Sequence, residues 1–138
     1  MTEPASTPPP TVWPAFNARD PRAMIDFLVA IGFEATAVYG DEHEVAHAQL
    51  DWPEGGGVMF GSVKDHGLSR PPGGAGLYVV TADPRAVHDR AVAAGARITR
   101  APENPDYAGP DGWEFSLEDP EGNAWSFGSY PGEPRAGG

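Results

Sequence analysis

Apolar and polar residues alternate along most of this chain, and two segments have the spacing of a helix instead. Both helical segments, 20–32 and 83–95, begin with DPRA, which places Asp at the N-cap and Pro at the first helical position. Alternation with period two, bounded by Gly, Pro and Asp, predicts the strands around them. The expected strands cover 11–17, 33–39, 45–52, 57–63, 76–82, 96–100, 113–118 and 123–130. Their order is βαβββ, twice, which predicts an α+β fold.

The sequence also repeats itself, and the repeat supports this division. DPRA begins at Asp20 and again at Asp83, 63 residues later. The segment DWPEGGGVMFGS (51–62) matches EDPEGNAWSFGS (118–129) at six of twelve positions, with an offset of 67. The offset changes in connecting loops, where insertions cost little free energy. We therefore expect one domain, 11–130, made of two modules, 11–63 and 75–130.

Residues 43–47 have the sequence HEVAH, which matches the HExxH pattern of zinc metalloproteases. That pattern binds zinc on a helix, where residues i and i+4 share one face. The segment 45–52 instead alternates between two faces, as a half-buried strand does. Four residues of strand span roughly 13 Å, so His43 and His47 would lie too far apart to share a metal ion. The sequence therefore does not predict a metalloprotease.

Composition narrows the range of partners. Nine Lys and Arg residues against 20 Asp and Glu residues give a formal net charge of −11, which repels nucleic-acid phosphates and anionic lipids and attracts cations. The absence of Cys excludes disulfides and thiolate chemistry. Residues 1–10 lack the apolar run of a signal peptide or anchor, which predicts a cytoplasmic protein. Proline-rich 1–10 and Gly-rich 131–138 are expected to form a disordered leader and a loose tail.

Paired βαβββ modules that close on LEDPEGNAWSFGSY resemble the vicinal oxygen chelate superfamily, and the hairpin VAHAQL…VMFGS is similar to its glyoxalase and bleomycin-resistance members. The superfamily also contains extradiol dioxygenases and fosfomycin-resistance enzymes. The resemblance covers roughly residues 11–130. It implies that each module forms a curved four-stranded sheet with its helix outside, and that the two sheets surround a cleft. It also implies a homodimer, in which the partner chain completes the cleft.

The resemblance further implies where a metal would bind. Enzymes of the superfamily hold a divalent cation with one His, Gln or Glu from the first and the last strand of each module. On the last strands these positions fall on Ser126 and, by the internal repeat, on Met59. On the first strands they fall on Leu77 and on Trp13 or Pro14. None of these side chains suits a divalent cation. We therefore expect neither a metal nor another cofactor, as in the bleomycin-resistance proteins, which sequester a drug.

Strand alternation assigns the remaining side chains either to the cleft or to a helix-facing core. The cleft set is mostly apolar with a few polar groups, as small-molecule sites usually are. Trp13, with Tyr107 or Trp113, is expected to stack on a planar cationic group. The candidate ligand-binding residues are Trp13, Asn17, His47, Gln49, Met59, Leu77, Val79, Tyr107, Trp113, Glu114 and Ser126. The helix-facing core is expected to contain Phe16, Leu50, Phe60, Tyr78, Val80, Phe115, Leu117, Trp125 and Phe127.

Two functions of different classes follow. The first is a metal-free homodimer that sequesters an aromatic or cationic compound, with antibiotic resistance as one use. The second is a glyoxalase-like lyase or isomerase, or another enzyme of the superfamily with a displaced or absent metal site, in which His47 or Glu114 acts as general base. The sequence shows no His–carboxylate pair at strand spacing, which favours the first. The segment 101–112 is either a lid, with Tyr107 as its apolar contact, or an insertion.

Overall fold

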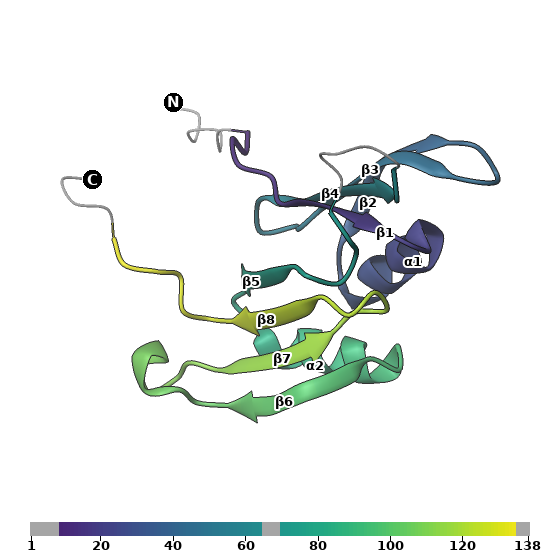
Figure 1. Ribbon diagram of the computed structural model, residues 1–138. Coiled ribbons are helices and arrows are strands. Elements are labelled where there is room, and N and C mark those ends of the chain that lie inside the picture. The colour runs from purple at the N-terminus through teal and green to yellow at the C-terminus, as the bar shows by residue number, and fades with distance from the viewer. Residues whose placement is uncertain (1–8, 65–69, 135–138) are drawn as a thin grey trace.

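The computed structural model describes residues 9–64 and 70–134, and within them it confirms the predicted α+β fold of two βαβββ modules (Figure 1). Most of the expected leader, 1–8, and the end of the expected tail, 135–138, lie outside the described residues. Module 1 contains β1 (Ala15–Ala18), α1 (Pro21–Ile31), β2 (Glu34–Gly40), β3 (Val45–Asp51) and β4 (Gly57–Ser62). Module 2 contains β5 (Gly76–Val80), α2 (Pro84–Ala93), β6 (Arg97–Glu103), the 3₁₀ turn η1 (Asp106–Ala108), β7 (Glu114–Glu118) and β8 (Ala124–Gly128).

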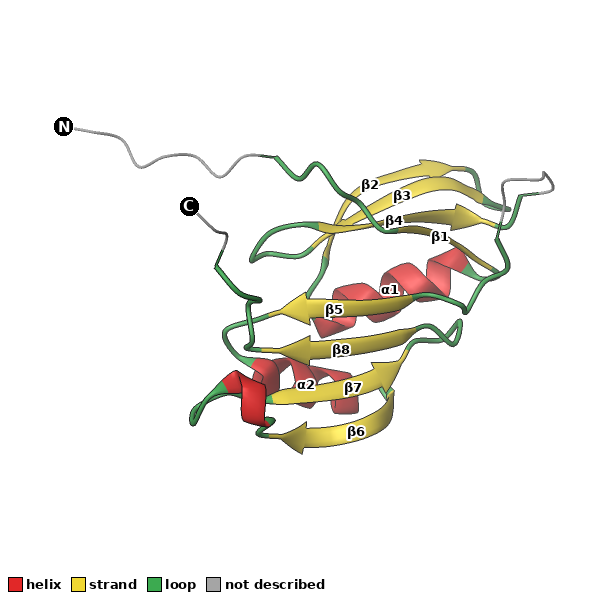
Figure 2. Ribbon diagram, turned by 60° about the vertical axis from the view of Figure 1, so that its left-hand side comes forward, coloured by secondary structure: helices red, strands yellow, loops and turns green. Residues whose placement is uncertain are grey.

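Each module forms a sheet of the same topology. The strand orders are β1-β4-β3-β2 and β5-β8-β7-β6, and in both sheets the first strand runs parallel to the last while the other pairs are antiparallel. Each helix packs against its own sheet, and the two helices contact one another (Figure 2). Among the described residues no helix packs on the opposite face of either sheet. We call that opposite face the open face of each module.

The two helices begin in the same way, as the repeated DPRA predicts. The side chains of Asp20 and Asp83 each accept a hydrogen bond of 3.1 Å from a backbone N–H three residues later, at Ala23 and Ala86. Each cap is followed by Pro at the start of the helix. Helix α1 then ends at Gly32, whose φ of 125° lies in the region that favours glycine. None of the helices in the described part of the chain is long and apolar enough to cross a membrane.

One hydrophobic core connects the modules. The ring of Phe33, which follows α1, packs edge-on against Trp125 of β8, with centroids 5.6 Å apart. Trp52, at the end of β3, lies 5.8 Å from Phe127 and donates its indole N–H to the backbone oxygen of Val80 at 3.2 Å. Trp125 and Phe127 are fully buried. The helix sides of both sheets therefore contribute to a single core, which fixes how the modules are docked.

The repeated PEG turns also join the modules, each to the start of the other module's helix. The Glu121 carboxylate accepts hydrogen bonds from the backbone N–H groups of Arg19 at 2.7 Å and Asp20 at 3.0 Å. Its counterpart by the repeat, Glu54, accepts one from the N–H of Ala82 at 2.8 Å. The internal repeat therefore corresponds to a reciprocal contact, in which each turn caps the chain just before the helix of the other module.

Candidate functional site

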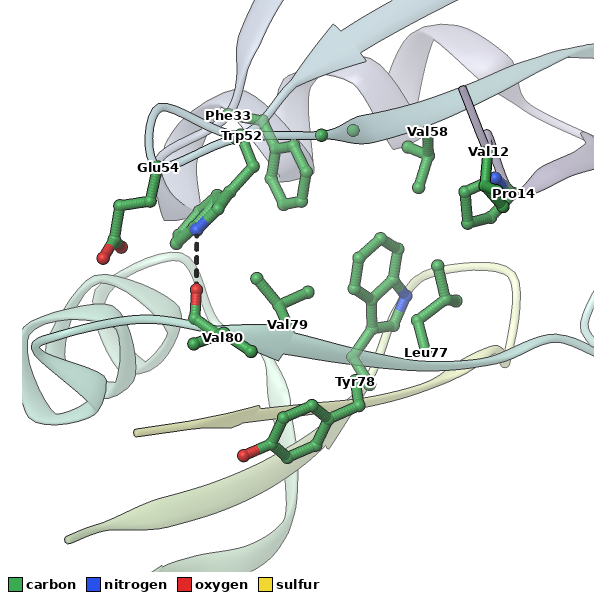
Figure 3. Close-up of a pocket in the computed structure, with 14 residues that line it drawn as sticks. Val12, Pro14, Phe33, Trp52, Glu54, Val58, Leu77, Tyr78, Val79 and Val80 are labelled. Atoms are coloured by element: carbon green, nitrogen blue, oxygen red, sulfur yellow. Dashed lines mark hydrogen bonds between the residues drawn. The ribbon is translucent and has the colours of Figure 1, made fainter. Parts of the chain in front are cut away.

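The side chains of strand β5 point to the faces opposite to those that the sequence predicts. Neighbouring residues of parallel strands share a face, and Leu77 is paired with Trp125 while Val79 is paired with Phe127. Since both partners are buried on the helix side, Leu77 and Val79 point there too. They line a cavity of about 460 Å³ between the modules, and Figure 3 shows both side chains directed into it. The prediction that Leu77 and Val79 face the cleft is therefore wrong.

The same pairing places Tyr78 and Val80 on the open face of module 2. Tyr78 is opposite Ser126, and Figure 3 shows its ring directed away from the cavity between the modules. Both side chains are exposed, at 44% for Tyr78 and 40% for Val80, so the prediction that they belong to the core is wrong. The segment GLYVV carries apolar residues on both alternating sets, so its pattern contains no information on which set is buried.

Trp113 also lies outside the predicted cleft. The guanidinium of Arg85, in the first turn of α2, stands 3.7 Å from the centre of the Trp113 ring. This cation–π contact holds the indole on the helix side of module 2. The next residue, Glu114, then projects to the open face, because successive side chains of a strand point to opposite faces. Trp113 was predicted to stack on a ligand, and this placement is a correction.

The open face of module 2 carries a continuous polar network centred on Glu114. One oxygen of Glu114 accepts from the guanidinium of Arg100, and the other accepts from the hydroxyl of Tyr107 at 2.5 Å. Arg100 also bonds Glu103 at 2.8 Å and Ser116 at 3.2 Å. The Glu114 residue is only 4% exposed, so its charge depends on these partners. The hydrogen bond to Glu114 raises the pKa of Arg100 above its usual range and is the main cause that raises the pKa of Tyr107.

Beside this network, three tyrosines line an open cavity of about 560 Å³. We call it the tyrosine cavity. Its ring walls come from Tyr78 on β5, Tyr107 on η1 and Tyr130 just beyond β8. Val80, Pro131 and Gly132 complete the lining. Ser126, a predicted ligand-binding residue, is paired with Tyr78 in the sheet and shares a hydrogen bond of 2.8 Å with Ser116.

The open face of module 1 holds the remaining predicted residues in a looser arrangement. Trp13 and Gln49 line a cavity of about 310 Å³, where the amide of Gln49 donates to Asp51 at 3.0 Å. The ring of His47 stacks on Tyr39, with centroids 6.3 Å apart. The remaining two predicted residues are Met59, paired with Gln49 across the sheet, and Asn17, which donates to the backbone oxygen of Arg70 at 3.0 Å.

The structure also corrects the positions at which a superfamily metal would bind. In module 1, Ala15 rather than Trp13 or Pro14 is paired with Met59. In module 2, Tyr78 rather than Leu77 is paired with Ser126. A methyl group, a thioether, a phenol and a hydroxyl do not fit a divalent cation that carboxylate or imidazole ligands would hold. Among the described residues, no group of three or more His, Cys, Asp or Glu side chains is placed to hold a metal ion.

Sequence reasoning missed four residues that shape the open face of module 2: Tyr78, Val80, Arg100 and Tyr130. Arg100 was placed at the end of a strand, but β6 continues to Glu103, which brings the guanidinium beside Glu114. A signal for Tyr78 was present, because the offset of 63 from Ala15 leads to it. Tyr130 was assigned to the strand end, and its contact with Tyr78 spans 52 residues of sequence. Nothing in the local pattern predicts such a contact.

Two sheets with free open faces and a shared core on the helix side define the class of this protein, which is the vicinal oxygen chelate fold. The glyoxalase-like domain family matches residues 13–127, and the chain belongs to this family. None of the curated proteins matches the sequence. The predicted resemblance is thus confirmed at the level of the superfamily, whereas the metal-free, bleomycin-resistance-like branch stays a prediction.

Several solved structures are similar to this chain. TioX from Micromonospora sp. ML1 is 23% identical, over 84% of this chain and 94% of TioX, with a TM-score of 0.70. A glyoxalase/bleomycin resistance protein from Streptomyces sp. CB03234 is 24% identical, over 84% of this chain and 98% of that protein, with a TM-score of 0.61. A mutant glyoxalase I from Zea mays is 16% identical, over 83% of this chain and 43% of that enzyme, with a TM-score of 0.64. At these identities the likeness establishes the fold alone.

Proposed function

We propose that this protein binds and sequesters a small aromatic or cationic compound, without a metal, in the tyrosine cavity of module 2. The composition of that cavity carries the proposal. Its walls are aromatic and aliphatic, its volume of about 560 Å³ suits a drug-sized ligand, and Tyr107 connects it to the charged Glu114. Small-molecule sites are typically built in this way, from apolar walls with a few fixed polar groups. Sequestration of an antibiotic, and hence resistance to it, is one use of such binding.

The alternative is a glyoxalase-like lyase or isomerase with a displaced or absent metal site. Its general base would be Glu114 or His47, and a base must come within hydrogen-bond reach of a substrate proton. Both oxygens of Glu114 already accept hydrogen bonds, from Arg100 and Tyr107, and the residue is buried. His47 lies on the other open face, stacked on Tyr39. These contacts favour a structural role for Glu114 and support binding over catalysis.

A homodimer is part of the proposal. The open faces expose large apolar side chains, with Tyr39 at 63% and Tyr107 at 55%, and a second copy would cover them. The segment 101–112 then acts as a lid, since η1 carries Tyr107 onto the wall of the cavity. Light scattering checks the assembly. A mass of 14.6 kDa at micromolar concentration, the mass of one chain, contradicts the dimer.

The function is tested by native mass spectrometry of the purified full chain, followed by calorimetric titration with a panel of aromatic compounds. We expect dimer, no stoichiometric metal, and binding that weakens about tenfold or more in Tyr78→Ser and Tyr130→Ser, since each loses a wall that buries the ligand. Val92→Ser, which changes an exposed residue of helix α2 away from both open faces, is the control and should bind normally. Chemical turnover of a bound compound, or a bound metal that is lost in His47→Ala, contradicts the proposal.

A further inference from the structure

Three tyrosines, Tyr78, Tyr107 and Tyr130, line the tyrosine cavity. The rings of Tyr107 and Tyr130 meet at 71°, with centroids 5.3 Å apart. Tyr78 lines the same cavity, and its hydroxyl donates to the backbone oxygen of Tyr130 at 2.8 Å. The rings belong to three separate segments, β5, η1 and the residues that follow β8. A group that enters the cavity therefore contacts tyrosines from three separate segments of the chain.

All three phenol hydroxyls are already engaged as donors. Tyr78 donates to a carbonyl oxygen, Tyr107 donates to Glu114 at 2.5 Å, and Tyr130 donates to the carboxylate of Glu133 at 2.7 Å. A phenol that donates to an anion carries more electron density on its ring, and the same contacts raise the pKa of Tyr107 and of Tyr130. The ring faces thus become more attractive to a cation.

The charges around the cavity favour a cation as well. Among the described residues, Glu114 and Glu133 accept from the hydroxyls of Tyr107 and Tyr130, and Glu103 pairs with Arg100, so these contacts contain three carboxylates and one guanidinium. Arg100 is held by Glu103 and Glu114 and is not among the residues that line the cavity. The chain as a whole adds a formal charge of −11. An anion would meet repulsion from both sources.

We propose that the tyrosine cavity is an aromatic cage for an alkylated ammonium group, such as a trimethylammonium group carried by an aromatic compound. This inference rests on the proposed function and names its ligand class. The cage offers ring faces to a cation while its phenol protons are all engaged, so it suits a charge that neither donates nor needs hydrogen bonds. A primary ammonium would have to give up strong hydration on entry, because its N–H groups find few acceptors on ring carbon.

The test compares the binding of matched ligands to the full chain by calorimetry. The probes are benzyltrimethylammonium, its uncharged isostere neopentylbenzene, benzylammonium, and benzoate as the anion. We expect benzyltrimethylammonium to bind about tenfold more tightly than the uncharged isostere, which is the size of a desolvated cation–π contribution. Benzylammonium should bind more weakly than the trimethylated cation, and benzoate most weakly of all.

Variants separate the ring faces from their hydroxyls. Tyr107→Leu and Tyr130→Leu each remove one wall and should reduce the preference for the cation over the isostere several-fold. Tyr107→Phe keeps the ring and loses only the hydrogen bond to Glu114, so it should keep most of the preference. Val92→Ala is the control on helix α2 and should leave all four affinities unchanged. Circular dichroism checks that each variant is folded, which the exposure of Tyr107 leads us to expect.

The outcomes separate the cage from the general function. Equal affinities for benzyltrimethylammonium and neopentylbenzene overturn the cage and leave sequestration standing. A preference that survives unchanged in Tyr107→Leu and Tyr130→Leu also overturns it, because the cation then binds elsewhere. Failure of all four probes, while other aromatic compounds bind, overturns the cage alone. If no aromatic compound binds at all, both the cage and the proposed function are wrong.

Discussion

Module 1 presents an imidazole, an amide, a thioether and the ring of Tyr39 on its open face, whereas module 2 presents a guanidinium, a carboxylate and the rings of Tyr78, Tyr107 and Tyr130. His47 stacks on Tyr39 of β2, and Gln49 donates to Asp51, which also accepts from Thr36 of β2, so these contacts stay within strands β2 and β3. In module 2, by contrast, Arg100 links strands β6 and β7, and Tyr107 extends the link to η1. The two faces have the same backbone and different chemistry. The repeated residues are therefore those of the helix starts and the PEG turns that join the modules, whereas the side chains of the open faces differ.

The helix sides of the modules also differ in how they hold the PEG turn. In module 2 the carboxylate of Asp119 accepts from the backbone of Glu121 and from the indole of Trp125, at 2.8 Å each. The repeat places Trp52 at the position of Asp119, and its indole instead crosses to Val80 of the other module. The PEG turn of module 2 is therefore held by hydrogen bonds within that module, whereas the corresponding residue of module 1 forms its hydrogen bond with the other module. The predictions below test this asymmetry.

The largest expected effect is the loss of Trp125, compared with its module 1 counterpart by the repeat, Val58. Both are buried beneath their helices. Trp125→Ala should lower the free energy of unfolding by about 3–5 kcal/mol, because it leaves a large cavity and removes the hydrogen bond to Asp119. Val58→Ala removes only two methyl groups and should cost about 1.5–2 kcal/mol. Urea denaturation measures both.

Trp125→Phe serves as the control for this comparison, because it keeps most of the buried ring and removes the indole N–H. The decrease in the free energy of unfolding of Trp125→Phe should fall between the decreases of the two alanine variants. If Trp125→Ala and Val58→Ala lose equal stability, the buried side chain of module 2 contributes no more to the free energy of unfolding than its counterpart in module 1.

The second comparison breaks the two reciprocal turn contacts. Glu121 accepts two backbone N–H groups with a side chain that is only 5% exposed, whereas Glu54 accepts one. Glu121→Ala should therefore lower the free energy of unfolding by about 2–3 kcal/mol and Glu54→Ala by about 1 kcal/mol. Thermal and urea denaturation report the difference. Glu121→Gln keeps one acceptor oxygen and should recover part of the loss, and an equal cost for both alanine variants would speak against the asymmetry.

The internal repeat made much of this fold predictable from the sequence. The features that it did not predict depend on contacts between distant residues. The helix starts were predictable because the caps at Asp20 and Asp83 are local contacts, between residues three apart. The side chains of β5 were not, because every residue of LYVV can be buried and only the pairing with β8 decides. The tyrosine cavity depends on Tyr130, whose contact with Tyr78 is long-range. Site chemistry here arises from tertiary pairing, which no local pattern encodes.

A third prediction concerns Trp113, which the sequence placed in the cleft and the structure places beneath Arg85. Trp113→Leu should lower the free energy of unfolding by only about 0.5–1 kcal/mol, the value of an exposed cation–π contact. Because the indole does not line the tyrosine cavity, ligand affinity should stay unchanged. Calorimetry and urea denaturation on the same variant measure the two quantities. A loss of affinity without a loss of stability would show that Trp113 takes part in ligand binding after all.

The smallest expected effect is a change in the titration of one hydroxyl, and it tests whether the polar network of module 2 is connected as described. The hydrogen bond to Glu114, followed by burial, raises the pKa of Tyr107 above its usual value of about 10. The neutral phenol is thus the form that the fold stabilises. Its contribution to stability is fully present below the pKa of the unfolded chain, about 10, and is lost as pH rises through the higher pKa of the folded chain.

Tyrosinate absorbance, measured as the difference between the wild-type chain and Tyr107→Phe, isolates this group. Glu114→Gln should bring the Tyr107 midpoint back toward about 10, because a neutral amide no longer opposes the phenolate. An unchanged midpoint in that variant would mean that Tyr107 does not contact Glu114 in solution, and that module 2 lacks the extended network that distinguishes it from module 1.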